Sequence, residues 1–396
     1  MNNLIEFINE KAEAIFNKVV GYREHLHKNP ELSFEEFETA KFVEETLANI
    51  GIQQIKRIGK TGVTGLIIGK HHSINDKFIG LRADLDALPI IEENEVSYKS
   101  QNEGVMHACG HDVHTSILLG TAEILNEIKD ELPHPIKLIF QPGEEKNPGG
   151  ASILIKEGVL DNPSISHMYA LHVYPEMKAG KIGYKPGLYM ASCDEIYITI
   201  HGKGGHGAMP HQCIDPIAIG ATIVTSLQQI VSRNCDPKIP CVLTFGHFEA
   251  IGATNIIPSK AILKGTFRTM DETWRESALT LIKIQVEAIV NSFGGCVDIE
   301  ISRGYPCLIN DELLTIKSKE KLKDVLGEEN IDELPIRLTS EDFAFYSQVV
   351  PVCFLRLGVG DVNKSINYGV HHPKFDIDKR SLKTGIITLS NLVVNQ

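Results

Sequence analysis

Apolar and polar residues follow two different patterns along the chain, and the pattern changes near residue 186. In the first part the apolar runs are continuous, as in VTGLIIG (63–69) and IKLIFQP (136–142), which is typical of strands buried on both faces of a sheet. Other segments, such as 114–129, have apolar residues at helical spacing. Strands that alternate with helices predict an α/β fold with a mainly parallel sheet. The same pattern resumes after residue 303.

The segment between these parts has the pattern of half-exposed antiparallel strands. Its first strand, DEIYITIH (194–201), alternates polar and apolar residues. The elements that follow are a helix near 216–232, strands at 241–248 and 260–269, a helix at 272–293 and a strand at 296–302. The order βαββαβ is that of the ferredoxin-like fold. We therefore expect a main domain formed by residues 1–186 and 303–396, with a second domain, residues 187–302, inserted into it.

Composition and charge exclude several classes of protein. The 396 residues are 42% hydrophobic and 23% charged, as in globular proteins, and the net charge of −12 disfavours nucleic acids and anionic membranes as partners. No apolar run approaches the ~18 residues of a membrane-spanning helix. The first helix carries acidic residues and lacks the apolar core of a signal peptide. We expect a cytoplasmic protein with reduced cysteines and with no nucleic-acid or membrane partner.

Several side chains with metal-binding chemistry follow predicted strands or begin a helix. Only Gly110 separates Cys109 from His111, which lets both side chains converge. Ligands of α/β sheets bind outside the carboxyl ends of the strands, so we expect these groups to meet there. The expected donors are Cys109, His111, Glu145, His172 and one histidine of VHHPKF (370–375). Such mixed donors suit one or two ions of Zn²⁺, Mn²⁺, Co²⁺ or Ni²⁺ in an open site, where the Cys109 thiolate could bridge two of them.

The adjacent carboxylates Glu144 and Glu145 directly follow a predicted strand. One carboxylate of such a pair can bind metal while its neighbour takes a proton from the attacking water and returns it to a leaving group. The pair alone is common on protein surfaces. Together with the cysteine and histidine donors, it predicts a catalytic site.

The chain resembles the M20 metallopeptidase/amidohydrolase family, and within it the branch of N-acyl-amino-acid amidohydrolases that includes hippurate and indoleacetyl-amino-acid hydrolases. The resemblance spans residues ~20–376, and the ordered set of motifs is specific although each motif alone is weak. The motifs are YREHLHKNPELSFEE (22–36), LRADLDALPI (81–90), MHACGHDVH (106–114), QPGEE (141–145), LHVYP (171–175), GKGGHGAMPH (202–211), TNIIP (254–258), GTFRT (265–269) and HHPKF (371–375).

The resemblance implies a role for each matching residue near the expected metal. Glu144 matches the general base, and Asp86 matches an acid that orients a ligand. In many relatives a metal-binding histidine stands at the position of Asp84 and a bridging aspartate at that of Cys109. Both departures are typical of the amidohydrolase branch, and they leave one or two ions possible. The residues that match its metal ligands are Cys109, His111, Glu145, His172 and, two positions before the proline, His371.

The resemblance also assigns three residues of the inserted domain to the substrate. His206 matches a histidine that reaches into the active site of a partner subunit and stabilises the carbonyl oxygen as it gains charge. Asn255 and Arg268 match residues that bind the carboxylate of the amino-acid product, and a guanidinium can hold a carboxylate through two parallel hydrogen bonds. A homodimer formed through the inserted domain is therefore expected.

The function implied by the resemblance is metal-dependent hydrolysis of the amide bond of small N-acyl amino acids, for example N-acetyl or benzoyl derivatives. The products would be a carboxylic acid and a free amino acid. N-acetyl-diaminopimelate and dipeptides are alternative substrates. The residues also leave two other interpretations open. One is a Cys109 nucleophile paired with His111 or His114, and the other is a metal-binding scaffold without activity.

Overall fold

The computed structural model describes residues 2–361 and 367–394, and the chain divides into two compact units. The first unit comprises Met1–Gly187, Ile309–Pro335 and Phe345–Gln396, and the second comprises Leu188–Leu308 and Ile336–Ala344. The second unit is therefore larger than the segment 187–302 expected from the sequence. The roles expected of the two domains, catalysis and dimerisation, stay predictions.

Hydrogen bonds explain why the additional residues belong to the second unit. The Gly304 carbonyl accepts a hydrogen bond from Arg275 at 3.1 Å, which holds the chain in this unit beyond the last strand. Farther along, the Arg337 N–H donates to the Tyr189 carbonyl at 2.9 Å, and the Arg337 carbonyl accepts from the Ala191 N–H at 3.1 Å. These contacts join segments that are distant in the sequence, so the local pattern of apolar residues does not reveal them.

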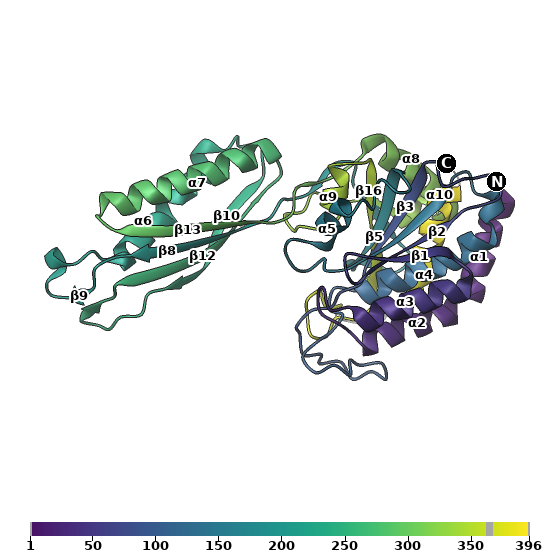
Figure 1. The fold of residues 1–396 in the computed structure, drawn as a ribbon, viewed down its shortest axis with the longest axis horizontal. Coiled ribbons are helices and arrows are strands. Elements are labelled where there is room, and N and C mark those ends of the chain that lie inside the picture. The colour runs from purple at the N-terminus through teal and green to yellow at the C-terminus, as the bar shows by residue number, and fades with distance from the viewer. Residues whose placement is uncertain (1, 362–366, 395–396) are drawn as a thin grey trace. The chain divides into compact units, whose positions relative to one another are not determined.

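The first unit is built on one large, mostly parallel sheet (Figure 1), which confirms the predicted α/β class. The order of its strands in the described residues is β1-β2-β4-β3-β5-β16-β6-β15. Strand β3 runs parallel to both β4 and β5, whereas β2 pairs antiparallel with β1 and β4. The strands are β1 (Gln53–Ile58), β2 (Gly62–Ile67), β3 (Phe78–Asp84), β4 (Ile136–Gln141), β5 (Ile165–Lys178), β6 (Ile182–Tyr184), β15 (Ile331–Glu333) and β16 (Val352–Gly360).

Helix α4 (His111–Glu127) occupies the centre of the helical layer of this unit. Nearly all of its side chains are buried, because it contacts α1, α2, α3 and α10 as well as strand β3. A helix covered on so many sides needs apolar or internally paired residues around most of its circumference. The other helices of this unit are α1 (Asn2–Ala14), α2 (Phe16–Lys28), α3 (Phe37–Ile50), α5 (Gly150–Lys156), α8 (Glu312–Leu326) and α10 (Arg380–Val394), and the short α9 (Ala344–Ser347) lies at the boundary of the units.

The second unit has the ferredoxin-like arrangement predicted from the order of its elements. Within residues 188–308, all of which are described, the sheet order is β10-β12-β8-β13 and every pairing is antiparallel. Helices α6 and α7 pack on this sheet through a separate apolar core (Figure 1). The elements are β8 (Asp194–His201), α6 (Pro216–Gln229), β10 (Cys241–Glu249), β12 (Lys260–Thr269), α7 (Glu272–Ser292) and β13 (Cys296–Arg303), with short strands β7 (Gly187–Met190), β9 (Gly205–His206), β11 (Ile256–Ile257) and β14 (Leu308–Asn310) nearby in the chain.

Among the described residues, we find no helix that combines the length and the apolar character needed to cross a membrane.

Candidate active site

The predicted metal donors of the first unit gather at one edge of its sheet. Because β3 is parallel to β4 and β5, the carboxyl ends of these three strands meet at that edge. Helix α4 begins at the same place. The site residues carried by these elements are Asp84 and Asp86 at the end of β3, Glu144 and Glu145 after β4, His172 in β5, and Cys109 and His111 at the start of α4.

Cys109 and His172 face each other across the site. The Cys109 Sγ lies 3.4 Å from the His172 Nε2, and the His172 Nδ1–H donates to the Val173 carbonyl at 2.8 Å. The Nε2 therefore directs its lone pair into the site. Gly110 has a φ of 83°, and a Cβ there would lie 2.7 Å from the Val173 side chain, so only glycine fits between Cys109 and His111.

Asp86 organises the backbone that carries the two glutamates. Its carboxylate accepts hydrogen bonds from the N–H groups of Glu144 at 3.1 Å and Glu145 at 3.0 Å. It also accepts from the Ser33 hydroxyl at 2.6 Å and pairs with the His111 Nδ1 at 3.2 Å. Asp86 thus contacts both an imidazole and the turn that carries the two glutamates, and the role that the family resemblance implies for it stays a prediction.

The surroundings of the His111 Nε2 favour a bound cation. This atom is buried and has no hydrogen-bond partner among the described residues. Carboxylate oxygens of Asp84, Glu144 and Glu145 lie 3.7, 3.9 and 4.0 Å from it. A buried polar atom without a partner is costly. A metal ion at this place would bind the lone pair of the Nε2 and compensate the surrounding negative charge.

The pKa of His111 reports the excess of negative charge. Burial lowers this pKa, but the carboxylates of Asp84 and Asp86 outweigh that effect and raise it to about 10. Without another cation the imidazole is therefore protonated. A divalent ion can replace that proton, because metal binding and proton release are coupled at such ligands.

The surroundings of Cys109 and His172 favour the uncharged form of each side chain. Burial, followed by the charges of Glu145 and Glu144, raises the pKa of the Cys109 thiol well above its usual range. Burial and the nearby Arg356 guanidinium hold the pKa of His172 well below its usual range, so that imidazole is neutral. A neutral imidazole is ready to bind metal, whereas the thiol loses its proton only when a metal ion is bound. The side chains of His111, Cys109 and His172 together fit a divalent metal ion.

Of the two adjacent late histidines, the structure brings His371 to the site. Its Nε2 lies 3.1 Å from the Glu145 Oε1, and its donor atom groups with those of Cys109 and Glu145. The His371 backbone has a φ of 65°, and its N–H donates to the Ala108 carbonyl at 2.7 Å. His372 stacks on Tyr368 instead, with ring centroids 4.3 Å apart.

The three residues predicted to contact the substrate lie in the second unit, and they do not form one group there. His206 pairs with Ile256, and the N–H of Gly207 donates to the Asn255 carbonyl at 2.8 Å, so His206 and Asn255 are neighbours. Arg268 lies near the far end of β12. It donates to the Leu338 carbonyl at 3.2 Å and the Ser340 hydroxyl at 3.3 Å.

The structure also shows the partners of Asp84 and His114, which the sequence analysis did not count among the metal donors. Asp84 accepts from Arg82 at 2.6 Å and pairs with the His114 Nδ1 at 2.5 Å, while the His114 Nε2 accepts from the Val173 N–H at 2.9 Å. His114 therefore links β3 to β5 and has no ring nitrogen left for a metal.

Glu36 is a residue that the sequence analysis did not assign to the site. Its carboxylate accepts from the Gly143 N–H at 2.8 Å, directly before Glu144. It lies within the motif 22–36, and that position was the one available sequence signal. The contact itself spans 107 positions and could not be read from the chain.

The first unit has a mostly parallel sheet with buried sulfur, nitrogen and carboxylate donors at the carboxyl ends of its strands. This arrangement is that of a metal-dependent hydrolase whose fold belongs to the α/β class. Residues 80–395 match the model of peptidase family M20/M25/M40, and the chain belongs to this family. The family acts on amide bonds, so the protein is an amide hydrolase that uses a divalent metal.

Individual relatives agree with this assignment. An N-acyl-L-amino acid amidohydrolase of Geobacillus stearothermophilus is 43% identical over 77% of this chain and 81% of its own. The IAA-amino acid hydrolase ILR1-like 5 of Arabidopsis thaliana is 38% identical over 96% of this chain and 87% of its own. The crystal structure of the Bacillus subtilis YXEP protein, described as a dinuclear metal-binding peptidase of the M20 family, has a TM-score of 0.79. Its identity is 31%, and the match covers 96% of this chain and 98% of that one.

Proposed function

We propose that the protein hydrolyses the amide bond of small N-acyl amino acids and releases a carboxylic acid and a free amino acid. The observation that carries the proposal is the group of donors around the His111 Nε2, with Glu144 beside them. The names of the amidohydrolase relatives support this substrate class. We assign the metal to Cys109, His111, Glu145, His172 and His371.

The bound metal would polarise the acyl carbonyl and acidify water. Glu144 is our general base: it takes a proton from the attacking water and then gives it to the leaving amine. Asp86 holds the backbone of Glu144 in place through the 3.1 Å hydrogen bond. The mixed sulfur, nitrogen and oxygen donors favour one or two ions of Zn²⁺, Mn²⁺, Co²⁺ or Ni²⁺.

A cysteine nucleophile at position 109 is a weaker explanation. The thiol is buried and its pKa is raised, first by burial and then by Glu145 and Glu144, which opposes formation of the reactive thiolate. N-acetyl-diaminopimelate and dipeptides remain rival substrates within the same chemistry.

We further propose that the enzyme is a homodimer in which His206 completes the partner's active site. His206 would stabilise the oxyanion, and Asn255 and Arg268 would bind the product carboxylate. Lys260 begins β12 and pairs with His201, which stands just before the loop that carries His206. Arg268 lies about eight residues, or roughly 27 Å, farther along β12. That separation exceeds the length of a small acyl-amino acid. One substrate can therefore meet both groups only if they come from two copies.

A reducing, cytoplasmic location is part of the proposal. All eight cysteines are free, which agrees with a compartment that keeps thiols reduced.

The test of the catalytic assignment replaces Glu144 with Gln. We expect kcat to fall by about 100-fold or more while the bound metal per subunit is unchanged, since the amide cannot accept the proton. Activity is measured on acetyl-, benzoyl- and indoleacetyl-amino acids after chelation and after return of each metal. The matched control is Glu176→Gln, at an exposed position of β5. Wild-type turnover by Glu144→Gln would refute the assignment.

A further inference from the structure

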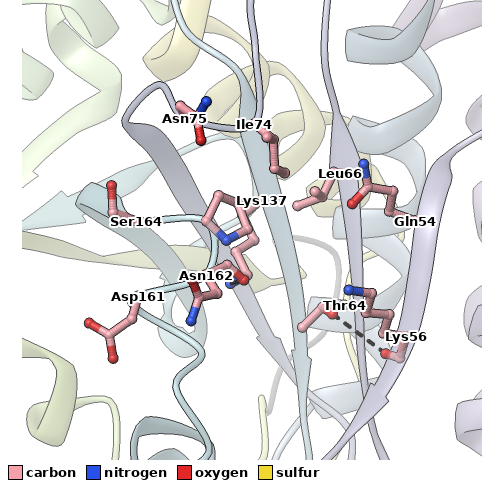
Figure 2. A pocket seen from close by; sticks show the side chains of 11 residues that line it. Gln54, Lys56, Thr64, Leu66, Ile74, Asn75, Lys137, Asp161, Asn162 and Ser164 are labelled. Atoms are coloured by element: carbon pink, nitrogen blue, oxygen red, sulfur yellow. Dashed lines mark hydrogen bonds between the residues drawn. The ribbon is translucent and has the colours of Figure 1, made fainter.

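A cavity lies in the first unit, at the end of strand β4 opposite the metal donors. Its volume is about 340 Å³, within the range of small-ligand sites. Figure 2 shows side chains of three neighbouring strands and two loops around it. Lys137 belongs to the beginning of β4, whereas Glu144 and Glu145 follow the end of that strand. The residues around the cavity are Gln54, Lys56, Thr64, Leu66, Ile74, Asn75, Lys137, Asp161, Asn162, Pro163 and Ser164.

Lys137 is the unusual residue of this cavity. Its side chain is buried, and only 3% of the residue is exposed. The Nζ donates to the Val159 carbonyl at 2.6 Å and to the Asn162 carbonyl at 3.0 Å. An ammonium group has three N–H donors, so one remains for a ligand in the cavity.

The charges around the cavity favour an anion. Lys56 and Lys137 carry positive charge and Asp161 carries negative charge, so the lining is cationic in a chain whose net charge is −12. Lys56 is exposed and has no ion-pair partner in the described part of the chain. Burial, and then the charge of Lys56, lowers the pKa of Lys137 to about 8. An anion between the two ammonium groups would reduce their repulsion.

The remaining lining side chains define the rest of the ligand. Leu66, Ile74 and Pro163 offer apolar surface, and Asp161 could accept from an amino group. We propose that this cavity binds a small carboxylate with a short apolar body, which Lys56 and Lys137 hold by its carboxylate. Two sources share this chemistry, namely a free amino acid and a simple carboxylic acid. Both are products of the proposed hydrolysis, and only this statement of source rests on the proposed function.

The test is calorimetric titration of the full-length, metal-loaded protein with 4-methylpentanoate and, separately, with leucine, which have the same apolar chain. We expect Lys56→Gln to weaken the binding of at least one probe by about tenfold or more, because a hydrogen bond between charged groups is lost. Lys41→Gln, at an exposed lysine outside the cavity, is the matched control and should bind like the wild type. Lys137→Met should also weaken binding, but this change could loosen the loop, so Lys56→Gln decides.

The two probes and Asp161→Asn distinguish the sources. If leucine binds more tightly than 4-methylpentanoate and Asp161→Asn weakens leucine binding, the cavity is an amino-acid site. If 4-methylpentanoate binds more tightly than leucine and Asp161→Asn strengthens its binding, the cavity is a carboxylic-acid site. The proposal is overturned if neither probe binds at millimolar concentration, or if Lys56→Gln binds both as the wild type does. Turnover is not measured, so failure of the proposed hydrolysis would leave this result intact.

Discussion

At the scale of single residues, the candidate site depends on carboxylates that bind no metal in our assignment. Asp86 holds the N–H groups of Glu144 and Glu145, and Glu36 holds that of Gly143. Three successive N–H groups of one turn are thus fixed by two buried side chains. These contacts set the position of Glu144, the proposed general base, and neither carboxylate needs to touch the substrate.

Glu36 provides a prediction about pH. Its carboxyl group is fully buried, and burial together with the charge of Asp86 raises its pKa from 4.5 to about 7. Folding therefore favours the protonated form, and this contribution to stability is present below pH 4.5 and is lost as the pH rises through 7. Relative to Glu36→Gln, the wild type should lose roughly 3 kcal/mol of unfolding free energy across this interval.

The measurement is urea unfolding of both metal-free proteins at several pH values between 4.5 and 8. Glu38→Gln, at an exposed neighbouring position, serves as the control and should follow the wild type. The prediction is wrong if the difference in unfolding free energy between the wild type and Glu36→Gln does not change with pH.

At the scale of elements, one buried ion pair joins helix α7 to strand β8. The Arg275 guanidinium donates to both Asp194 oxygens at 2.7 Å and also reaches the Gly304 carbonyl. Arg275 is 3% exposed and Asp194 is fully buried. The pair connects a helix, a strand and the chain that leaves the sheet. The second unit should therefore depend on it more than on any exposed pair.

Replacing Arg275 with Met should destabilise the second unit by about 3–5 kcal/mol, because Asp194 would be left buried and unpaired. Trp274 is the only tryptophan of the chain and lies beside Arg275, so its fluorescence during urea unfolding reports on this unit. Arg303→Met, which removes an exposed pair with Glu276, is the control and should cost much less. Equal losses of unfolding free energy in both variants would contradict the larger contribution expected of the buried pair.

At the scale of the whole molecule, the proposed dimer explains why the residues assigned to the substrate are divided between two ends of one sheet. The loop with His206 and Asn255 lies at one end of β12 and Arg268 at the other. A symmetric dimer presents the same residues twice, so the loop of one copy and the arginine of the other can serve one substrate.

Co-expression of Glu144→Gln with His206→Ala tests this arrangement. Each variant alone should be almost inactive. If His206 acts on the partner's site, a mixed dimer has one site with both groups intact, and random pairing should restore about a quarter of the wild-type activity. If His206 acts within its own chain, every site lacks one group and no activity returns. Sedimentation of the purified protein as a monomer would also exclude the proposed role.

Much of the fold follows from the sequence, because hydrophobic periodicity is a local property. The continuous apolar runs predicted the mostly parallel sheet, and the order of elements in 187–302 predicted the ferredoxin-like unit; both are confirmed. The chemical types of the site residues, a thiol, imidazoles and paired carboxylates, were also evident from the chain alone.

Only the tertiary structure decided how these groups meet. It brings His371, which the family resemblance had already singled out, to Glu145 across 226 positions, pairs both ring nitrogens of His114, and brings Glu36 to Gly143. It also adds the segment Ile336–Ala344 to the second unit. Contacts of this kind arise when distant segments pack around a shared core, and no local pattern of residues records them. The sequence determined which chemistry is available, and long-range packing decided which groups share one site.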